Sequence, residues 1–423
     1  MKRPILLLML TNVLGGVGVA SGIAVGALLI QQIAGTAYSG FGQALSVLGA
    51  AIAAVPLAQL AARKGRRAAL GLGYRVAAVG AAAVVVGAVL HSAVVLFVAL
   101  LLFGAAQATN LQTRYAGADF AAGPRRATLM SMVFWATTIG SALGPNLATY
   151  GDALGRSVAL PALSGSYLFG VVSFLLASGV VMLLPSGPAL APAAATSGRG
   201  TASARGATSG TERTAERRIS ALQALAWAMH HPTARFAVLL TAVAHGVMVG
   251  VMSMTPIHLN GHGHHLEVIG LVISLHILGM YALSPAFGWL TDRVGAMTVA
   301  GIGLAVLLAA VVTGMVAANG RLELTSAALI LLGLGWSASI IAASALLAGV
   351  DSGEVRVPLQ GANDALMNYV GAGAALLGGP VMAGLGYGGL NIGAGLLLVP
   401  AVLAGFAALR VPMAAAEREF SGR

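Results

Sequence analysis

Apolar residues run along most of the chain in long stretches, and short polar segments separate them. A helix needs about 20 apolar residues to cross the hydrocarbon core of a membrane. The pattern predicts twelve such helices, near residues 5–30, 38–61, 69–90, 93–115, 127–149, 163–184, 235–258, 266–290, 297–317, 325–349, 361–383 and 389–410. The predicted fold class is an all-α membrane protein, because a helix satisfies its own backbone hydrogen bonds in lipid.

Composition supports a protein whose main partner is the lipid bilayer. The 423 residues are 58% hydrophobic and only 8% charged, whereas about a quarter of a soluble domain is charged. The net charge of +11 does not indicate a nucleic-acid partner, since the basic residues lie in short polar segments and tails. The chain has no cysteine, which excludes disulfides and thiolate metal sites.

The basic residues also predict the orientation of the helices. They gather in alternate polar segments, among them Lys2, Arg3, Arg63, Lys64, Arg66, Arg67, Arg125, Arg126, Arg205, Arg213, Arg293, Arg356 and Arg418. Segments rich in Lys and Arg stay in the cytoplasm. We therefore expect a multi-pass protein of the bacterial inner (plasma) membrane with both termini in the cytoplasm.

One long polar segment divides the chain. Residues 186–232 include a stretch rich in Ala, Ser, Thr and Gly, which cannot build a core and is typical of a flexible linker. This cytoplasmic linker separates an N-terminal six-helix half, residues 1–185, from a C-terminal six-helix half, residues 233–423.

The two halves share a loop motif. The second predicted span ends in LAARKGRR, at 60–67, and the eighth ends in GWLTDRVG, at 288–295. Both resemble the cytoplasmic loop signature G-x-L-A-D-R-x-G-R-R/K of the Major Facilitator Superfamily, although the first copy has Ala58 and Ala62 in place of Gly and Asp. The resemblance implies a conformational role for Gly65, Arg66, Gly288, Asp292, Arg293 and Gly295.

That resemblance covers nearly the whole chain and implies a twelve-helix Major Facilitator bundle of two pseudo-symmetric halves. Transporters built from such repeats bind their substrate between the halves and rock one half against the other. We expect a transporter that acts as a monomer and is not an enzyme, because the sequence holds no phosphate loop, catalytic triad or thiol.

Two neighbouring spans carry soft metal ligands one helical turn apart. Met248 and Met252 lie in the seventh span, and His276 and Met280 lie in the eighth. Side chains four residues apart share a helix face, and thioethers favour Cu(I). The order M-x-x-x-M and then H-x-x-x-M resembles the CcoA-type copper importers. This resemblance implies import of copper as substrate, with no cofactor, to supply cytochrome oxidase assembly.

Further histidines surround these spans. His245 lies one turn from Met248, and the segment between the spans adds possible auxiliary ligands, namely Met254, His258, His262, His264 and His265. Dense histidine tracts favour metal binding. A collecting role for the external histidines and weak adventitious binding both remain open.

Two other functions compete with copper import. A proton-coupled drug or metabolite antiporter is favoured by the sequence from Gly140 to Pro145, which resembles the antiporter motif G-x-x-x-G-P, although close helix packing explains the same glycines. Asp364 is the main candidate for proton coupling, and Arg114 and Asp119 are near enough in sequence to form an interfacial pair at the end of the fourth span. A membrane sensor would need an extra ordered domain, which the linker cannot supply.

Overall fold

The computed structural model describes residues 3–34, 41–120, 125–161, 163–185, 219–350 and 353–410, and these ranges are almost entirely helical. The N-terminal half contains α1 (Arg3–Ala34), α2 (Phe41–Lys64), α3 (Arg66–Val89), α4 (Ala93–Phe103), α5 (Ala105–Phe120), α6 (Arg126–Ser157) and α7 (Ser166–Val181). The C-terminal part contains α8 (Ala221–His230), α9 (Pro232–Gly261), α10 (Leu266–Tyr281), α11 (Ser284–Val294), α12 (Ala296–Val316), the 3-10 helix η2 (Ala317–Asn319), α13 (Leu322–Ala348) and α14 (Gly353–Arg410).

These helices make the twelve predicted crossings. α4 and α5 form one apolar stretch, Ala93–Asp119, and α10 and α11 form another, Val268–Val294. α14 joins two crossings at Gly386, whose φ of 68° breaks the helix. Each half of the described chain therefore contributes six crossings, which confirms the predicted fold class.

The repeat is visible at two tight turns. Gly65, between α2 and α3, and Gly295, between α11 and α12, have φ values of 83° and 89°. Side chains rarely adopt this backbone region, and glycine does so without strain. We call the end of the bundle that holds these two turns the glycine-turn end, and the opposite end, which holds His262 and Gly320, the histidine end.

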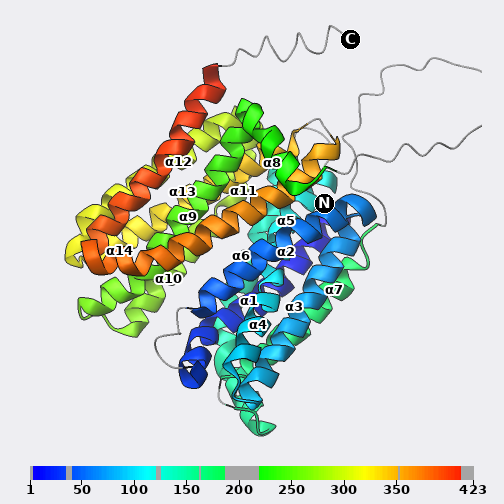
Figure 1. Cartoon of the computed structure of the whole chain (residues 1–423), viewed down its shortest axis with the longest axis vertical. Coiled ribbons are helices and arrows are strands. Elements are labelled where there is room, and N and C mark those ends of the chain that lie inside the picture. The colour runs from blue at the N-terminus through cyan, green and yellow to red at the C-terminus, as the bar shows by residue number, and fades with distance from the viewer. Residues whose placement is uncertain are drawn as a thin grey trace, which may run out of the picture.

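The two halves meet at the glycine-turn end and diverge toward the histidine end (Figure 1). α2 packs against α14, and α6 packs against α11. Gly361 of α14 lies so close to α2 that an added Cβ would overlap the Ala58 side chain. Ala58, the departure from the loop signature, thus lies at this contact. The hydrogen bonds and ion pairs between the halves, within the described ranges, lie from this end to the middle of the bundle.

The predicted linker differs from the structure at its end. Residues 186–218 lie outside the described residues, but 221–230 form helix α8. The Ser220 side chain accepts a hydrogen bond from the backbone N–H of Gln223, and the Gln223 side-chain oxygen accepts one from the Ser220 N–H. This capping box starts the helix, and Ala224 and Ala228 bury it against the C-terminal half. Leu225 and Trp227 also pack against this core.

Candidate functional site

A buried ion pair joins the two halves near the middle of the bundle. Arg114 of α5 donates from Nη2 to Oδ1 of Asp364 of α14, at 2.5 Å. Arg114 is 1% exposed and Asp364 is 0% exposed. Taking both charges out of water costs several kcal/mol, roughly, for each ion. A pair this expensive marks a functional site by default when it lies in a membrane span.

Local hydrogen bonds hold α5 so that Arg114 faces the other half. Tyr74 of α3 donates to the Asn110 side chain at 2.7 Å, and Asn12 of α1 donates to Thr113 at 2.5 Å. Gln112 donates to the backbone carbonyl of Ala54 on α2 at 2.9 Å. Three side chains of α5 are thus bonded inside the N-terminal half, which fixes the rotation of the helix and the direction of Arg114.

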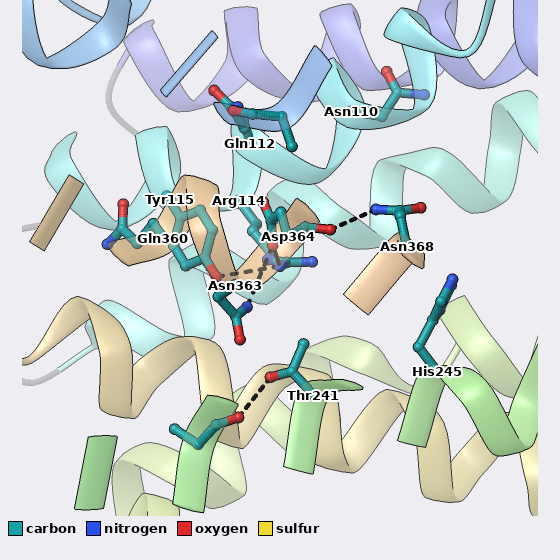
Figure 2. A network of polar contacts seen from close by, with 12 residues as sticks. Asn110, Gln112, Arg114, Tyr115, Thr241, His245, Gln360, Asn363, Asp364 and Asn368 are labelled. Atoms are coloured by element: carbon teal, nitrogen blue, oxygen red, sulfur yellow. Dashed lines mark hydrogen bonds and ion pairs between the residues drawn. The ribbon is translucent and has the colours of Figure 1, made fainter. Parts of the chain in front are cut away.

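Amide side chains surround the pair (Figure 2). Asn363 and Asn368 of α14 flank Asp364, and Asn368 donates to the Asp364 backbone carbonyl at 2.8 Å. Several buried polar atoms have no hydrogen-bond partner among the described residues, namely Arg114 Nε and Nη1, Asp364 Oδ2, Asn363 Oδ1 and Asn368 Oδ1. Buried polar groups are normally paired. This cluster therefore has the free hydrogen-bonding capacity that a polar ligand uses.

His245 of α9 faces the same cluster, and its tautomer follows from its partner. Trp336 of α13 donates from Nε1 to His245 Nδ1 at 3.2 Å. Indole Nε1 is only a donor, so Nδ1 holds the lone pair and the neutral ring carries its proton on Nε2. His245 Nε2 is buried and has no partner in the described part of the chain. In Figure 2 the ring points from α9 toward Asn368, so the site gains a second free donor beside Arg114.

Three aromatic rings lie beside the polar cluster. Phe134 of α6 contacts Tyr281 of α10 and Trp336 of α13, with ring centroids 5.1 and 5.9 Å apart. Tyr281 and Trp336 are also 5.9 Å apart. These rings pack in one core cluster with Leu111 and Met367, which lie one turn from Arg114 and Asp364 on their helices. The aromatic trio thus comes from both halves, as the ion pair does.

A second polar layer lies between the ion pair and the glycine-turn end. Arg66 of α3 donates to Asp119 of α5 and to Gln360 of α14, both at 2.8 Å. Arg356 of α14 is 4.0 Å from Asp119. The pairing of Arg114 with Asp119 suggested by their nearness in sequence is therefore wrong. Asp119 pairs with the loop-motif arginine, and Arg114 reaches the other half.

The second loop motif closes the glycine-turn end. Asp292 accepts hydrogen bonds from the backbone N–H groups of Ala127 and Thr128, at 2.9 and 2.8 Å, in the first turn of α6. Gly288 lies against Ser131, where an added Cβ would overlap the serine hydroxyl. Arg293 lies over the Trp289 ring at 5.1 Å. Asp292 and Gly288 thus hold α11 against α6, while Arg293 stays within its own half.

The predicted copper ligands lie in the C-terminal half. Met248 and Met280 are buried in one core cluster, and Met252 packs against it. His276 is buried, and its Nδ1 lies 2.7 Å from the backbone carbonyl of Leu329 on α13. A carbonyl only accepts, so Nδ1 carries the proton and Nε2 keeps its lone pair. α10 packs mainly against α13 rather than α9, so the two ligand pairs lie on helices with little direct packing.

The auxiliary histidines are engaged by backbone carbonyls. His258 contacts the Ala317 carbonyl at 3.2 Å, His262 that of His258 at 2.8 Å, and His264 that of Gly320 at 3.1 Å. His265 is exposed at the start of α10, and Met254 lies against Gly378 of α14. Within the described ranges, no group of three or more His, Cys, Asp or Glu side chains is placed to hold a metal ion.

The antiporter-like sequence lies in α6. Gly140 packs so closely on α1 that a Cβ would overlap the backbone of Val13 and Gly16, which favours its role in helix packing. The helix continues through Gly144 and Pro145, whose surroundings lie outside what the structure describes.

Sequence reasoning identified Asp364, with Asn363 and Asn368 nearby, but missed Arg114 and Trp336 as members of the site. An available signal was the cost of an arginine within an apolar span. The fold and this site define a class: a membrane transporter of two six-helix halves with a polar site between them.

Comparison with known proteins identifies the family, although no protein-family model matches the chain. It is 35% identical to YdeG of Bacillus subtilis, an uncharacterized MFS-type transporter, over 95% of this chain and 91% of that protein. It is likewise 35% identical to the uncharacterized MFS-type transporter YddS of the same organism, over 95% and 90%. The chain belongs to the Major Facilitator Superfamily.

More distant relatives share the architecture. The riboflavin transporter RfnT of Brucella anthropi is 27% identical, over 92% of both chains. The human organic anion transporter MFSD10 matches with a TM-score of 0.71 and 17% identity, over 95% of this chain and 99% of that chain. The E. coli fucose:proton symporter FucP matches with a TM-score of 0.69 and 17% identity, over 95% and 98%. These two solved structures establish the fold.

Proposed function

We propose that this Major Facilitator transporter carries a polar organic solute across the bacterial inner membrane, and that the Arg114–Asp364 pair is the centre of its substrate site. The observation that carries the proposal is the buried ion pair between the halves, surrounded by polar atoms without partners. Basic residues at the glycine-turn end favour a cytoplasmic position for that end. The halves, joined at that end, then correspond to an outward-facing state.

The polar site favours an organic solute over a bare ion. Guanidinium, amide and imidazole groups converge from α5, α9 and α14. A few placed polar groups beside aromatic rings are the usual composition of a small-molecule site. RfnT, the relative at 27% identity, is by name a transporter of an organic solute, which is consistent with this class. Asp364 is the residue through which a proton gradient would act, because its charge sets the strength of the inter-half pair.

Copper import is the second candidate, and one observation favours it. The Leu329 carbonyl orients His276 so that its Nε2 lone pair is free, and metal-binding histidines commonly donate their other N–H to a carbonyl. The three thioethers of Met248, Met252 and Met280 belong to or pack against one core cluster. We rank this candidate second because α10 packs mainly against α13 rather than α9, so the two pairs of ligands lie on helices with little direct packing.

Membrane vesicles that contain the native chain test both candidates. The vesicles are incubated under an inward proton gradient in a bacterial metabolite extract with about 1 µM copper, the lower end of the usual range of enzyme KM values. Mass spectrometry then measures the accumulated solutes and copper. We expect organic solutes that accumulate with the native chain but not with Arg114→Gln, while Thr298→Val, an exposed change remote from the site, behaves as native.

The opposite results are equally clear. Organic accumulation that is equal in native and Arg114→Gln vesicles would remove the proposed site. Copper accumulation that is lost in His276→Ala and Met252→Ala, but kept in Arg114→Gln, would support the second candidate instead.

A further inference from the structure

The free hydrogen-bonding groups nearest the ion pair include several donors. Arg114 has unpartnered Nε–H and Nη1–H groups, and His245 has an Nε2–H without a partner in the described residues. Both residues are almost fully buried, at 1% and 3% exposure. Arg114 carries the positive charge, and His245 adds a neutral donor. This combination of buried donors and positive charge suits an acceptor that is itself negative.

Asp364 already pairs with this guanidinium, but only one of the two carboxylate oxygens accepts a hydrogen bond from it. Oδ1 accepts from Arg114, while Oδ2 has no partner among the described side chains. A guanidinium binds a carboxylate best through two parallel hydrogen bonds. The pair is therefore incomplete on both sides. A second carboxylate that takes Nη2 from Asp364, together with the free Nε–H on the same edge of the guanidinium, would form two parallel bonds.

From this geometry we infer that the solute is an organic anion with a planar ring, and that its carboxylate replaces Asp364 as the partner of Arg114. The inference rests on the proposed function and names the substrate class of that site. The aromatic trio of Phe134, Tyr281 and Trp336 comes from both halves and packs with Leu111 and Met367, one turn from Arg114 and Asp364. Offset and edge-to-face contacts with these rings favour a planar body over an aliphatic one.

The charges balance if one proton accompanies each anion. When the substrate carboxylate pairs with Arg114, Asp364 is left as a buried anion without a partner, which is strongly unfavourable. Asp364 then takes up one proton from solution. The site keeps one positive and one negative group throughout, and the loss of the Arg114–Asp364 bond removes an inter-half contact. Anion and proton therefore enter together, and their binding loosens the joined halves.

Thermal unfolding of the purified full chain in detergent tests the anion with a matched pair of probes, 1-naphthoate and its neutral amide, 1-naphthamide. We expect naphthoate to stabilise the native chain at concentrations at least about tenfold lower than naphthamide does, since a hydrogen bond to a charged group is worth that factor or more. Asp364→Asn frees the guanidinium and should bind naphthoate several-fold more tightly. Arg114→Gln should lose the preference for naphthoate.

Proton uptake gives an independent measurement on the native protein. In a weakly buffered solution, naphthoate binding should take up about one proton per site in the native chain and none in Asp364→Asn. If either single variant fails to fold, the double variant Arg114→Gln with Asp364→Asn, which removes both charges, should bind the two probes equally and take up no proton.

Several outcomes would overturn the inference. These are equal binding of naphthoate and naphthamide by the native chain, weaker naphthoate binding in Asp364→Asn, or no naphthoate-induced shift in that variant. Each leaves the proposed function standing as long as vesicle uptake of an organic solute depends on Arg114. Uptake that is independent of Arg114 would reject the proposed function itself.

Discussion

Asp292 accepts hydrogen bonds from both the backbone N–H and the hydroxyl of Thr128, and it thereby fixes the end of one half to the start of a helix in the other. The N-terminus of α6 carries a partial positive charge from the aligned peptide dipoles, which favours an anion there. The first half has Ala62 at the matching position of its loop motif. The contact at the glycine-turn end is therefore asymmetric, with one carboxylate where a symmetric repeat would place two.

The first prediction concerns this contact. Asp292→Asn keeps the size of the side chain but removes its charge, so closure at the glycine-turn end should weaken by about 1 kcal/mol, or about fivefold in the ratio of closed to open forms. The natural absence of cysteine allows spin labels at Arg125→Cys and Val294→Cys, which are one on each half. Pulsed electron paramagnetic resonance should show a larger fraction of long distances between the two labels in Asp292→Asn than in the otherwise native protein.

Thr298→Val is the matched control, because Thr298 is exposed on α12 and its hydroxyl donates to the Val294 carbonyl at the end of α11, within the same half. A distance distribution that is the same in Asp292→Asn and native protein would contradict the role of Asp292 in closure.

The second prediction concerns the close approach of α11 and α6. Gly288→Ala places a Cβ into the Ser131 side chain, so the joined state should be disfavoured by about 1–3 kcal/mol, as in other overpacked contacts. Solute uptake should fall, and the same spin-label pair should report separation. Gly301→Ala adds the same methyl group where the structure describes nothing within 4 Å, and its uptake should match the native level.

The third prediction concerns the stability of the buried pair. Arg114→Gln or Asp364→Asn alone leaves one buried charge without a partner and should lower the free energy of unfolding by about 3 kcal/mol. The double variant should lose much less than the sum of the two single losses. Unfolding in detergent, monitored by circular dichroism, measures this non-additivity. Simple addition of the two losses would show that the pair is not coupled.

The fourth prediction concerns the histidine end. His258 stacks on Tyr387 of α14 with ring centroids 4.0 Å apart, and Tyr387 contacts Thr255 at 3.1 Å through its hydroxyl. His258→Ala removes the stack and the contact to Ala317, and should cost about 1–2 kcal/mol of stability. Tyr387→Phe keeps the stack and should cost less. His265→Ala changes an exposed ring and serves as control. An equal loss in all three variants would contradict a structural role for the stack.

The fold was predictable because its signals are local. Each span is a continuous apolar stretch, and the two turns at Gly65 and Gly295 carry a motif that the sequence repeats. The site was harder to predict because its members are distant in sequence. Arg114 and Asp364 are separated by 250 positions, and nearness in the chain instead suggested Asp119, which the fold assigns to Arg66.

The helical spacing of residues predicts which side chains share a face, but not which helix that face contacts. It placed His276 and Met280 on one face of α10, but it does not state which neighbouring helix that face meets. The tight packing of Gly333 on the backbone near His276 and Met280 brings α13 to that position, and the histidine therefore bonds to Leu329. Close contacts of small residues between helices decide such neighbours, and a single sequence does not identify the partner helix.

The burial of Arg114 and Asp364 also has a consequence for how this sequence can change over generations. A mutation at either residue alone passes through a chain with an isolated charge in its interior, whereas the loss of both is far less harmful. Descendants of this gene should therefore inherit the two residues together or exchange them together. A lineage in which only one has been replaced should show a compensating change at Asn363, Asn368 or His245.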